Sequence, residues 1–154
     1  MKILTIDYQS SDYGKNLVES LHHTGFAIIK NHPISYTLIN EVYSIWEQFF
    51  SLDIKNDYMF HPTKQDGYFP MLSEHAKGYS TKDLKEFFHI YPWGRYPKEI
   101  NDKSQELYQS LYRLSNKLLT EINIYTPDEI KNIFSMPLEN MALNSPQNLM
   151  RVMI

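Results

Sequence analysis

The sequence predicts an α+β fold in which a helical region carries a few short strands. Apolar residues recur at helical spacing in three segments, residues 12–23, 38–52 and 107–122. Short apolar runs bounded by Gly, Asn or Pro lie between these segments and at the C-terminal end. No internal repeat, low-complexity stretch or Gly/Ser linker divides the 154 residues, a length typical of one domain.

The first elements in chain order form a strand, a helix and a second strand. Residues 2–7 alternate well enough for a short strand, and residues 12–23 place several apolar side chains on one helical face. Gly25 stands where a helix C-cap glycine belongs. The apolar run at residues 26–29 is predicted to be a buried strand.

The second helix is the clearest element of the chain. Ser35 can cap its start, and the apolar pattern predicts its end near Leu52. Its buried stripe consists of Leu38, Val42, Ile45 and Phe49, widened by Ile39, Trp46 and Phe50.

The second half of the chain begins irregularly. Residues 53–80 contain two prolines and two glycines, which interrupt regular structure, so no regular element is predicted there. Residues 84–91 favour a strand that stops at Pro92. The third helix is expected to bury one face, made of Leu107, Leu111, Leu114, Leu118 and Ile122.

Two short elements are expected near the C-terminal end. Pro127 occupies the favoured first position of a short helix that runs to Phe134, with Thr126 as its cap. Residues 148–154 form the beginning of a strand. Since a terminal apolar strand leaves backbone groups unpaired without a neighbour, we expect a chain that is interrupted inside this strand.

The composition excludes several classes of function. The net charge is −3 with no basic block, which speaks against nucleic-acid binding, and no apolar run approaches the ~20 residues of a membrane span. The absence of cysteine removes disulfides, thiolate zinc sites and cysteine nucleophiles. With no signal-peptide pattern at the start, we expect a cytoplasmic protein.

Four segments, in order, resemble the N-terminal region of the isopenicillin-N-synthase-like oxygenases, which depend on Fe(II) and 2-oxoglutarate. They match the family's stretches "G-F-hydrophobic-x-V-x-N-H-G-I", "F-F-x-L-P", "G-Y-x-P…E…D-x-K-E-x-F" and "L-L-R-L-x-x-Y-P". The matching residues are 25–34 (GFAIIKNHPI), 46–52 (WEQFFSL), 67–89 (GYFP, EHAKG and DLKEFFH in turn) and 149–154 (LMRVMI). Two positions depart from the pattern: Pro33 replaces a Gly, and Gln65 stands where the tripeptide-cyclising synthase has Arg.

The resemblance implies an incomplete fold. Residues 1–147 would be the non-haem dioxygenase N-terminal region, and residues 148–154 the start of a truncated double-stranded β-helix (jelly-roll) core. The complete family enzyme uses Fe(II), held by two His and one carboxylate in an H-x-D…H arrangement, with 2-oxoglutarate as co-substrate. The substrate would be a small molecule of unknown identity.

The iron ligands of that arrangement are missing from this sequence. None of the six His residues is followed at the second position by Asp or Glu. We therefore expect no metal ligand, no catalytic residue and no cofactor bound by this chain alone. The core would come from a separate polypeptide, or the chain would associate with itself.

One rival metal pattern is present. Residues 19–22 and 86–89 both read E-x-x-H, which di-iron four-helix bundles use. The second copy lies in the predicted strand at 84–91, where positions i and i+3 point to opposite faces, so the pattern is not expected to bind metal there.

The same resemblance supplies candidate site residues. Tyr68, Phe69 and Lys77 lie in a segment that borders the substrate pocket in the family, and we expect them to bind substrate. Asp83 and Glu86 are expected to form structural hydrogen bonds. Trp46 and Trp93 are expected to be core or packing residues.

Two classes of function remain open from the sequence. The chain is either the N-terminal part of an oxygenase or a non-catalytic helical module for binding or interaction. In the first case the helix faces lack their usual cover. Exposed apolar patches, marginal stability and association would follow, because each uncovered large side chain forfeits ~1.5–3 kcal/mol.

Overall fold

The computed structural model describes residues 2–154, which fall into two compact units. The first unit takes in the chain up to Ser35 together with Leu107–Ser145. The second unit consists of Tyr36–Glu106 and Pro146–Ile154. None of the helices in this part of the chain is long and apolar enough to cross a membrane.

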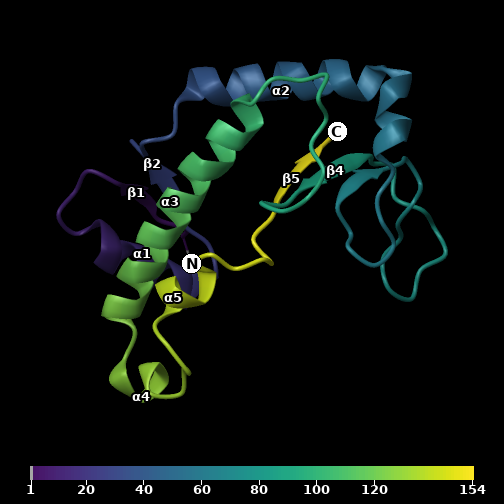
Figure 1. Ribbon diagram of the computed structural model, residues 1–154. Coiled ribbons are helices and arrows are strands. Elements are labelled where there is room, and N and C mark those ends of the chain that lie inside the picture. The colour runs from purple at the N-terminus through teal and green to yellow at the C-terminus, as the bar shows by residue number, and fades with distance from the viewer. Residues whose placement is uncertain (1) are drawn as a thin grey trace. The chain divides into compact units, whose positions relative to one another are not determined.

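The first unit joins a two-stranded parallel sheet to helices. In chain order it contains β1 (Thr5–Asp7), α1 (Tyr13–Thr24), β2 (Ile28–Lys30), most of α3 (Lys103–Tyr125), α4 (Asp128–Lys131) and α5 (Leu138–Ala142). Figure 1 shows β1, β2 and α1 beside α3, and the hydroxyl of Tyr13 on α1 donates to Glu121 Oε1 on α3 at 2.9 Å. Gly25 ends α1 with φ of 75° and donates its N–H to the Leu21 carbonyl, which confirms the predicted C-cap.

The strand predicted at residues 26–29 exists, but its burial was predicted wrongly. It is shifted to β2 and pairs in parallel with β1, in the register Thr5↔Ile28 and Asp7↔Lys30. Phe26 is 67% exposed and Ile28 is 54% exposed. A sheet of two short strands offers little surface for other elements to pack against, so apolar side chains in it can stay exposed.

The helices of the first unit also correct two predictions. Of the expected buried face of α3, only Leu107 is fully buried, and Leu111 is exposed. Pro127, not Thr126, is the N-cap residue of α4, and the Thr126 hydroxyl donates to the Ile122 carbonyl in the last turn of α3. Thr126 lies one position before the N-cap, so its hydroxyl bonds back within α3.

The second unit is built on a three-stranded antiparallel sheet in the order β3–β4–β5, of which Figure 1 labels β4 and β5. The strands span β3 (Gly67–Phe69), β4 (Phe87–Ile90) and β5 (Met150–Met153), preceded by α2 (Tyr36–Ser51) and a 3₁₀ helix, η1 (Asp53–Tyr58). β5 confirms the strand expected at the C-terminal end. η1 and β3 lie in the segment predicted to be irregular, since elements of six and three residues are too short to show a period.

An aromatic cluster forms the core of the second unit. Trp46 is 1% exposed, and its ring centroid lies 5.0 Å from that of Phe88 and 5.2 Å from that of Phe49. Its indole N–H donates to the buried Ser104 hydroxyl at 2.6 Å, so the buried polar atom is satisfied. Trp46 is therefore a core residue as predicted. Trp93 is a packing residue outside the core: it is 47% exposed, its ring stacks on that of Tyr91 at a centroid distance of 4.6 Å, and its N–H donates to the Pro146 carbonyl at 2.8 Å.

Candidate functional site

The three-stranded sheet of the second unit presents two chemically different faces. Successive side chains of a strand point to opposite sides, so Phe87 and His89 share one face of β4 while Phe88 and Ile90 share the other. The register aligns His89 with Arg151 on β5, and Phe87 with Phe69 on β3. We call the side that carries Phe69, Phe87, His89 and Arg151 the Arg151 face.

Arg151 is held in place by two contacts on this face. Its Nε–H donates to His89 Nε2 at 2.9 Å, and its guanidinium carbon lies 4.5 Å from the centroid of the Phe87 ring. Because a guanidinium can only donate, His89 Nε2 must be the acceptor. The hydrogen of the neutral imidazole then resides on Nδ1, which lies 2.9 Å from the Gln65 carbonyl oxygen and donates to it.

The surroundings of His89 keep its imidazole neutral. Burial lowers the pKa of His89, the positive charge of Arg151 lowers it further, and the hydrogen bond to the Gln65 carbonyl opposes them without reversing the shift. Arg151 itself forms no ion pair among residues 2–154. Its guanidinium is therefore not paired directly with a protein carboxylate in this part of the chain.

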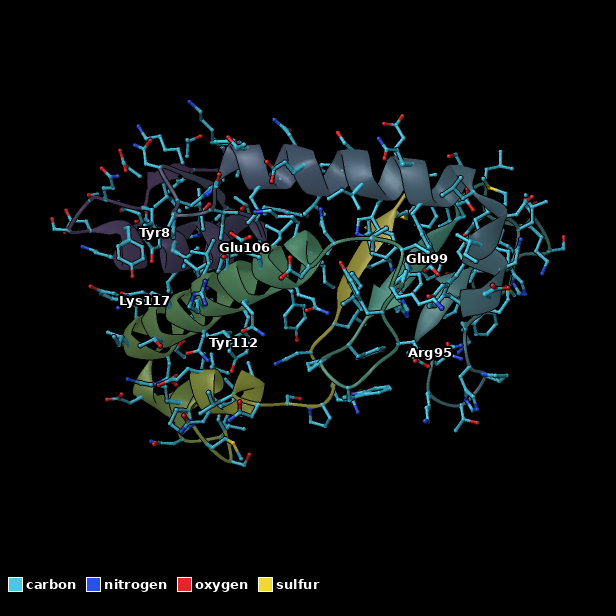
Figure 2. All side chains as sticks on the ribbon, turned by 45° about the horizontal axis from the view of Figure 1, so that its top comes forward. Tyr8, Arg95, Glu99, Glu106, Tyr112 and Lys117 are labelled. Atoms are coloured by element: carbon cyan, nitrogen blue, oxygen red, sulfur yellow. The ribbon has the colours of Figure 1, made fainter. Side chains whose placement is uncertain are left out.

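The loop that presents the Gln65 carbonyl is fixed by Arg95, which Figure 2 labels in the segment after β4. Gln65 adopts a left-handed backbone conformation with φ of 62°, which is uncommon for a residue other than glycine. Next to it, the Asp66 carboxylate accepts from the backbone N–H of Arg95 at 3.0 Å and from its Nε at 3.1 Å. Burial works against ionisation of Asp66, but the bonds from Arg95 outweigh it and lower the pKa of that carboxyl.

The opposite face carries a buried hydrogen-bonded triad. The Tyr68 hydroxyl donates to Glu86 Oε2, and Lys55 Nζ lies 2.8 Å from the same oxygen. Lys55 also donates to the Phe50 carbonyl at 2.6 Å. Burial disfavours the charged lysine, yet the bond to Glu86 prevails and the pKa of Lys55 is raised. The triad ties η1 to the sheet, which confirms the structural role predicted for Glu86.

The second predicted structural acid lies in the loop between β3 and β4. Asp83 pairs with Lys85 at 2.9 Å, Glu74 pairs with the same lysine at 3.2 Å, and the Asp83 N–H donates to the Glu74 carbonyl. These bonds close the loop on itself, as expected for a structural role.

The predicted substrate-binding residues do not come together in one place. Tyr68 and Phe69 are neighbours on β3 but point to opposite faces, and both are buried. Phe69 belongs to the Arg151 face, where its ring stacks between those of Phe60 and Phe87 at centroid distances of 4.2 and 4.5 Å. Lys77 is exposed in the loop between β3 and β4.

His89 and Arg151 were not predicted as site residues from the sequence. They are 62 positions apart in the chain, so no local motif joins them. Polar residues within otherwise apolar strands were the available signal, in the runs FFHI and MRVM.

The described residues do not fit a metal centre. Among residues 2–154, no three His, Asp or Glu side chains come together as a group that could hold an ion. Glu86 and His89, the second E-x-x-H pair, engage partners on opposite faces of the sheet. The rival di-iron pattern is therefore wrong for this pair.

The first unit contains a separate apolar groove of about 590 Å³. Side chains from α1, α3 and the α4–α5 region line it, with charged and imidazole groups of α1 among them. The lining includes Val18, Leu21, His22, Ile122, Ile130 and Phe134.

Comparison with known proteins identifies the family. Residues 4–115 match the family described as the N-terminal region of non-haem dioxygenases, "non-haem dioxygenase in morphine synthesis N-terminal". The chain belongs to this family. No curated protein sequence matched the chain.

Solved structures agree with membership of the dioxygenase N-terminal family. A predicted oxygenase from Shewanella oneidensis is 42% identical over 99% of this chain, with a TM-score of 0.88. A 2OG-Fe(II) oxygenase family protein from Caulobacter crescentus is 26% identical over 80% of the chain, with a TM-score of 0.61. A full-length Neurospora crassa protein, solved in complex with α-ketoglutarate (2-oxoglutarate), shares the fold at 19% identity over 79% of the chain, with a TM-score of 0.66.

The chain spans about half the length of these relatives. It covers 54% of the Shewanella protein, 48% of the Caulobacter protein and 46% of the Neurospora protein. β5 and Arg151 lie beyond the residues that match the family, but within the near-complete alignment to the Shewanella structure.

Proposed function

We propose that this chain is the N-terminal part of a 2-oxoglutarate- and Fe(II)-dependent oxygenase that acts on a small molecule. The observation that carries the proposal is the family match, supported by 42% identity to a predicted oxygenase over 99% of the chain. The alternative of a non-catalytic helical binding module gains no support from these relatives.

The proposal assigns the catalytic iron to residues outside this chain. Residues 1–147 form the N-terminal region, and residues 148–154 begin the jelly-roll core. Since β5 pairs with β4, the proposed beginning of the core shares one sheet with the N-terminal region. The proposed partner, in the cytoplasm, is a polypeptide that carries the jelly-roll core or a second copy of this chain.

The role of this chain is to shape the substrate pocket. The Arg151 face is the proposed wall, because it combines a cation that has no ion-pair partner within residues 2–154 with ordered aromatic rings. Phe69 backs this wall, Tyr68 positions β3 from the opposite side, and Lys77 is a ligand contact offered by the adjoining loop.

Iron binding and turnover test the proposal. The purified chain, loaded anaerobically with ferrous iron and 2-oxoglutarate and then desalted, should retain far less than one iron per chain and release no succinate. A longer reading frame that adds a jelly-roll core should restore both iron retention and 2-oxoglutarate-dependent oxygen uptake. One iron per chain and succinate release from this polypeptide alone would refute the assignment of the ligands. A core-bearing protein that binds iron without consuming 2-oxoglutarate would refute the oxygenase.

A further inference from the structure

We infer that Arg151 is the recognition site for a carboxylate group of an organic ligand, with His89 and Phe87 as the residues that position it. The inference deepens the proposed function and rests on it, since the ligand would be the small-molecule substrate at the pocket wall. It is carried by the contacts of Arg151, by the charge around it and by the fixed tautomer of His89.

The contacts leave one edge of the guanidinium available. His89 occupies the Nε–H of Arg151, and the Phe87 ring lies against the planar group at 4.5 Å from its carbon. These two contacts fix the plane of the guanidinium. Its two terminal amino groups donate no hydrogen bond to any residue within residues 2–154. A guanidinium edge of this kind matches the two oxygens of a carboxylate.

The charge around Phe87 favours a ligand with a single negative charge. Lys85 also approaches the Phe87 ring, at 5.6 Å, but Asp83 and Glu74 already pair with it. Arg151 is therefore the cation at this ring that lacks a carboxylate partner within residues 2–154. Since the two cations and the two carboxylates cancel, Arg151 suits the single charge of a carboxylate better than a phosphate dianion, which would need further cations.

The tautomer of His89 fixes the orientation of the Arg151 guanidinium. A protonated imidazole would repel Arg151 and could not accept its Nε–H. The Gln65 carbonyl takes the Nδ1 hydrogen, so the lone pair of Nε2 faces Arg151. An arginine that only covered the Phe87 ring would not need His89 Nε2 as an acceptor, nor a fixed orientation of that imidazole.

An NMR titration of the full chain tests the inference. The Nε–H resonance of Arg151 is followed in ¹⁵N-labelled protein while sodium acetate is added at constant ionic strength and neutral pH. We expect a saturable shift, with a dissociation constant on the order of millimolar for so small a probe. Arg113, an exposed arginine on α3 that contacts Ser110, provides the internal control and should show no saturable shift.

Variants separate recognition from structure. Arg151→Gln should abolish the saturable response, read from the His89 imidazole resonances, and Arg151→Lys should weaken it about tenfold because a lysine cannot bind both oxygens in one plane. Arg113→Gln should leave acetate binding unchanged. If Arg151→Gln does not fold, the unmodified chain and Arg151→Lys decide the question.

Two results would overturn the inference. The first is a linear shift of equal size at Arg151 and Arg113, which indicates ionic screening alone. The second is tighter binding of inorganic phosphate than of acetate. The titration contains neither iron nor 2-oxoglutarate, so its failure leaves the oxygenase proposal standing. Conversely, if acetate binds but the core-bearing protein shows no turnover, only the oxygenase proposal is refuted.

Discussion

His89 is the residue whose protonation the fold controls most directly. Its imidazole touches the Arg151 guanidinium and the Gln65 carbonyl, the Phe69, Phe87 and Tyr91 rings surround it, and the Glu74 carboxylate acts on it electrostatically. Burial lowers the pKa of His89 below its ordinary value and Arg151 lowers it further, while the Gln65 carbonyl and Glu74 oppose the shift without reversing it. Folding therefore selects the neutral imidazole.

This preference predicts a stability that falls in mild acid. Above the ordinary histidine pKa of about 6.5 both the folded and the unfolded states carry neutral His89, so it adds no pH dependence. As the pH falls through that value the unfolded state takes up a proton first, and the free energy of unfolding decreases until the pH passes below the lowered pKa of the folded state.

Urea unfolding of the unmodified chain and of His89→Gln, at neutral pH and at about pH 5, measures this effect. The variant should lose part of the pH dependence, since glutamine can accept the Arg151 hydrogen bond without titrating. His61→Gln, at an exposed position between η1 and β3, serves as the control and should retain it. Identical pH dependence in all three proteins would contradict the assignment to His89.

At the scale of elements, the approach of β3 to its neighbours depends on one glycine. Gly67 opens β3 with φ of 103°, a conformation that other residues rarely adopt. A Cβ atom there would collide with the Tyr58 carbonyl oxygen and lie 2.8 Å from Arg95 Nη2. The same Arg95 atom donates to the carbonyls of Met59 and Asp66, so it cannot move away without breaking those bonds.

Gly67→Ala is therefore predicted to cost roughly 3 kcal/mol or more of unfolding free energy, from the backbone conformation and the collision together. Gly78→Ala is the matched control, because Gly78 also has a positive φ, of 86°, but nothing lies within 4 Å of its Cβ position. It should cost only about 1–2 kcal/mol. Equal losses in the two variants, measured by chemical denaturation, would show that the close packing of β3 is unimportant.

How far the sequence predicts these elements depends on their length. α1, α2 and α3 were predicted because apolar residues repeat over three or more turns, and the C-cap glycine at Gly25 followed from local backbone chemistry. β3, with three residues, and α5, with five, are too short to display a period. The site was harder still to predict from the sequence, because only the register of β4 against β5 brings His89 and Arg151 together.

At the scale of the whole molecule, the exposed apolar surface is the property with the widest consequence. The groove of the first unit is lined mainly by apolar side chains, and much of the predicted apolar face of α3 is only half-buried. Surfaces of this kind mark places where another chain or segment binds. We propose that copies of this chain associate through the groove when no other partner covers it.

Two isoleucines of the α4 region offer a matched test of this association. Ile130 lines the groove and is 47% exposed, whereas Ile133 is 79% exposed and does not line it. Ile130→Glu should lower the fluorescence of a bound apolar dye and delay elution on gel filtration to the monomer position, because a charge in the groove would have to be desolvated on association. Ile133→Glu adds the same charge three residues away and should change neither measurement. If the unmodified chain elutes as a monomer and binds no dye, the groove is not an association surface, and its apolar residues serve only the packing of α1 against α3.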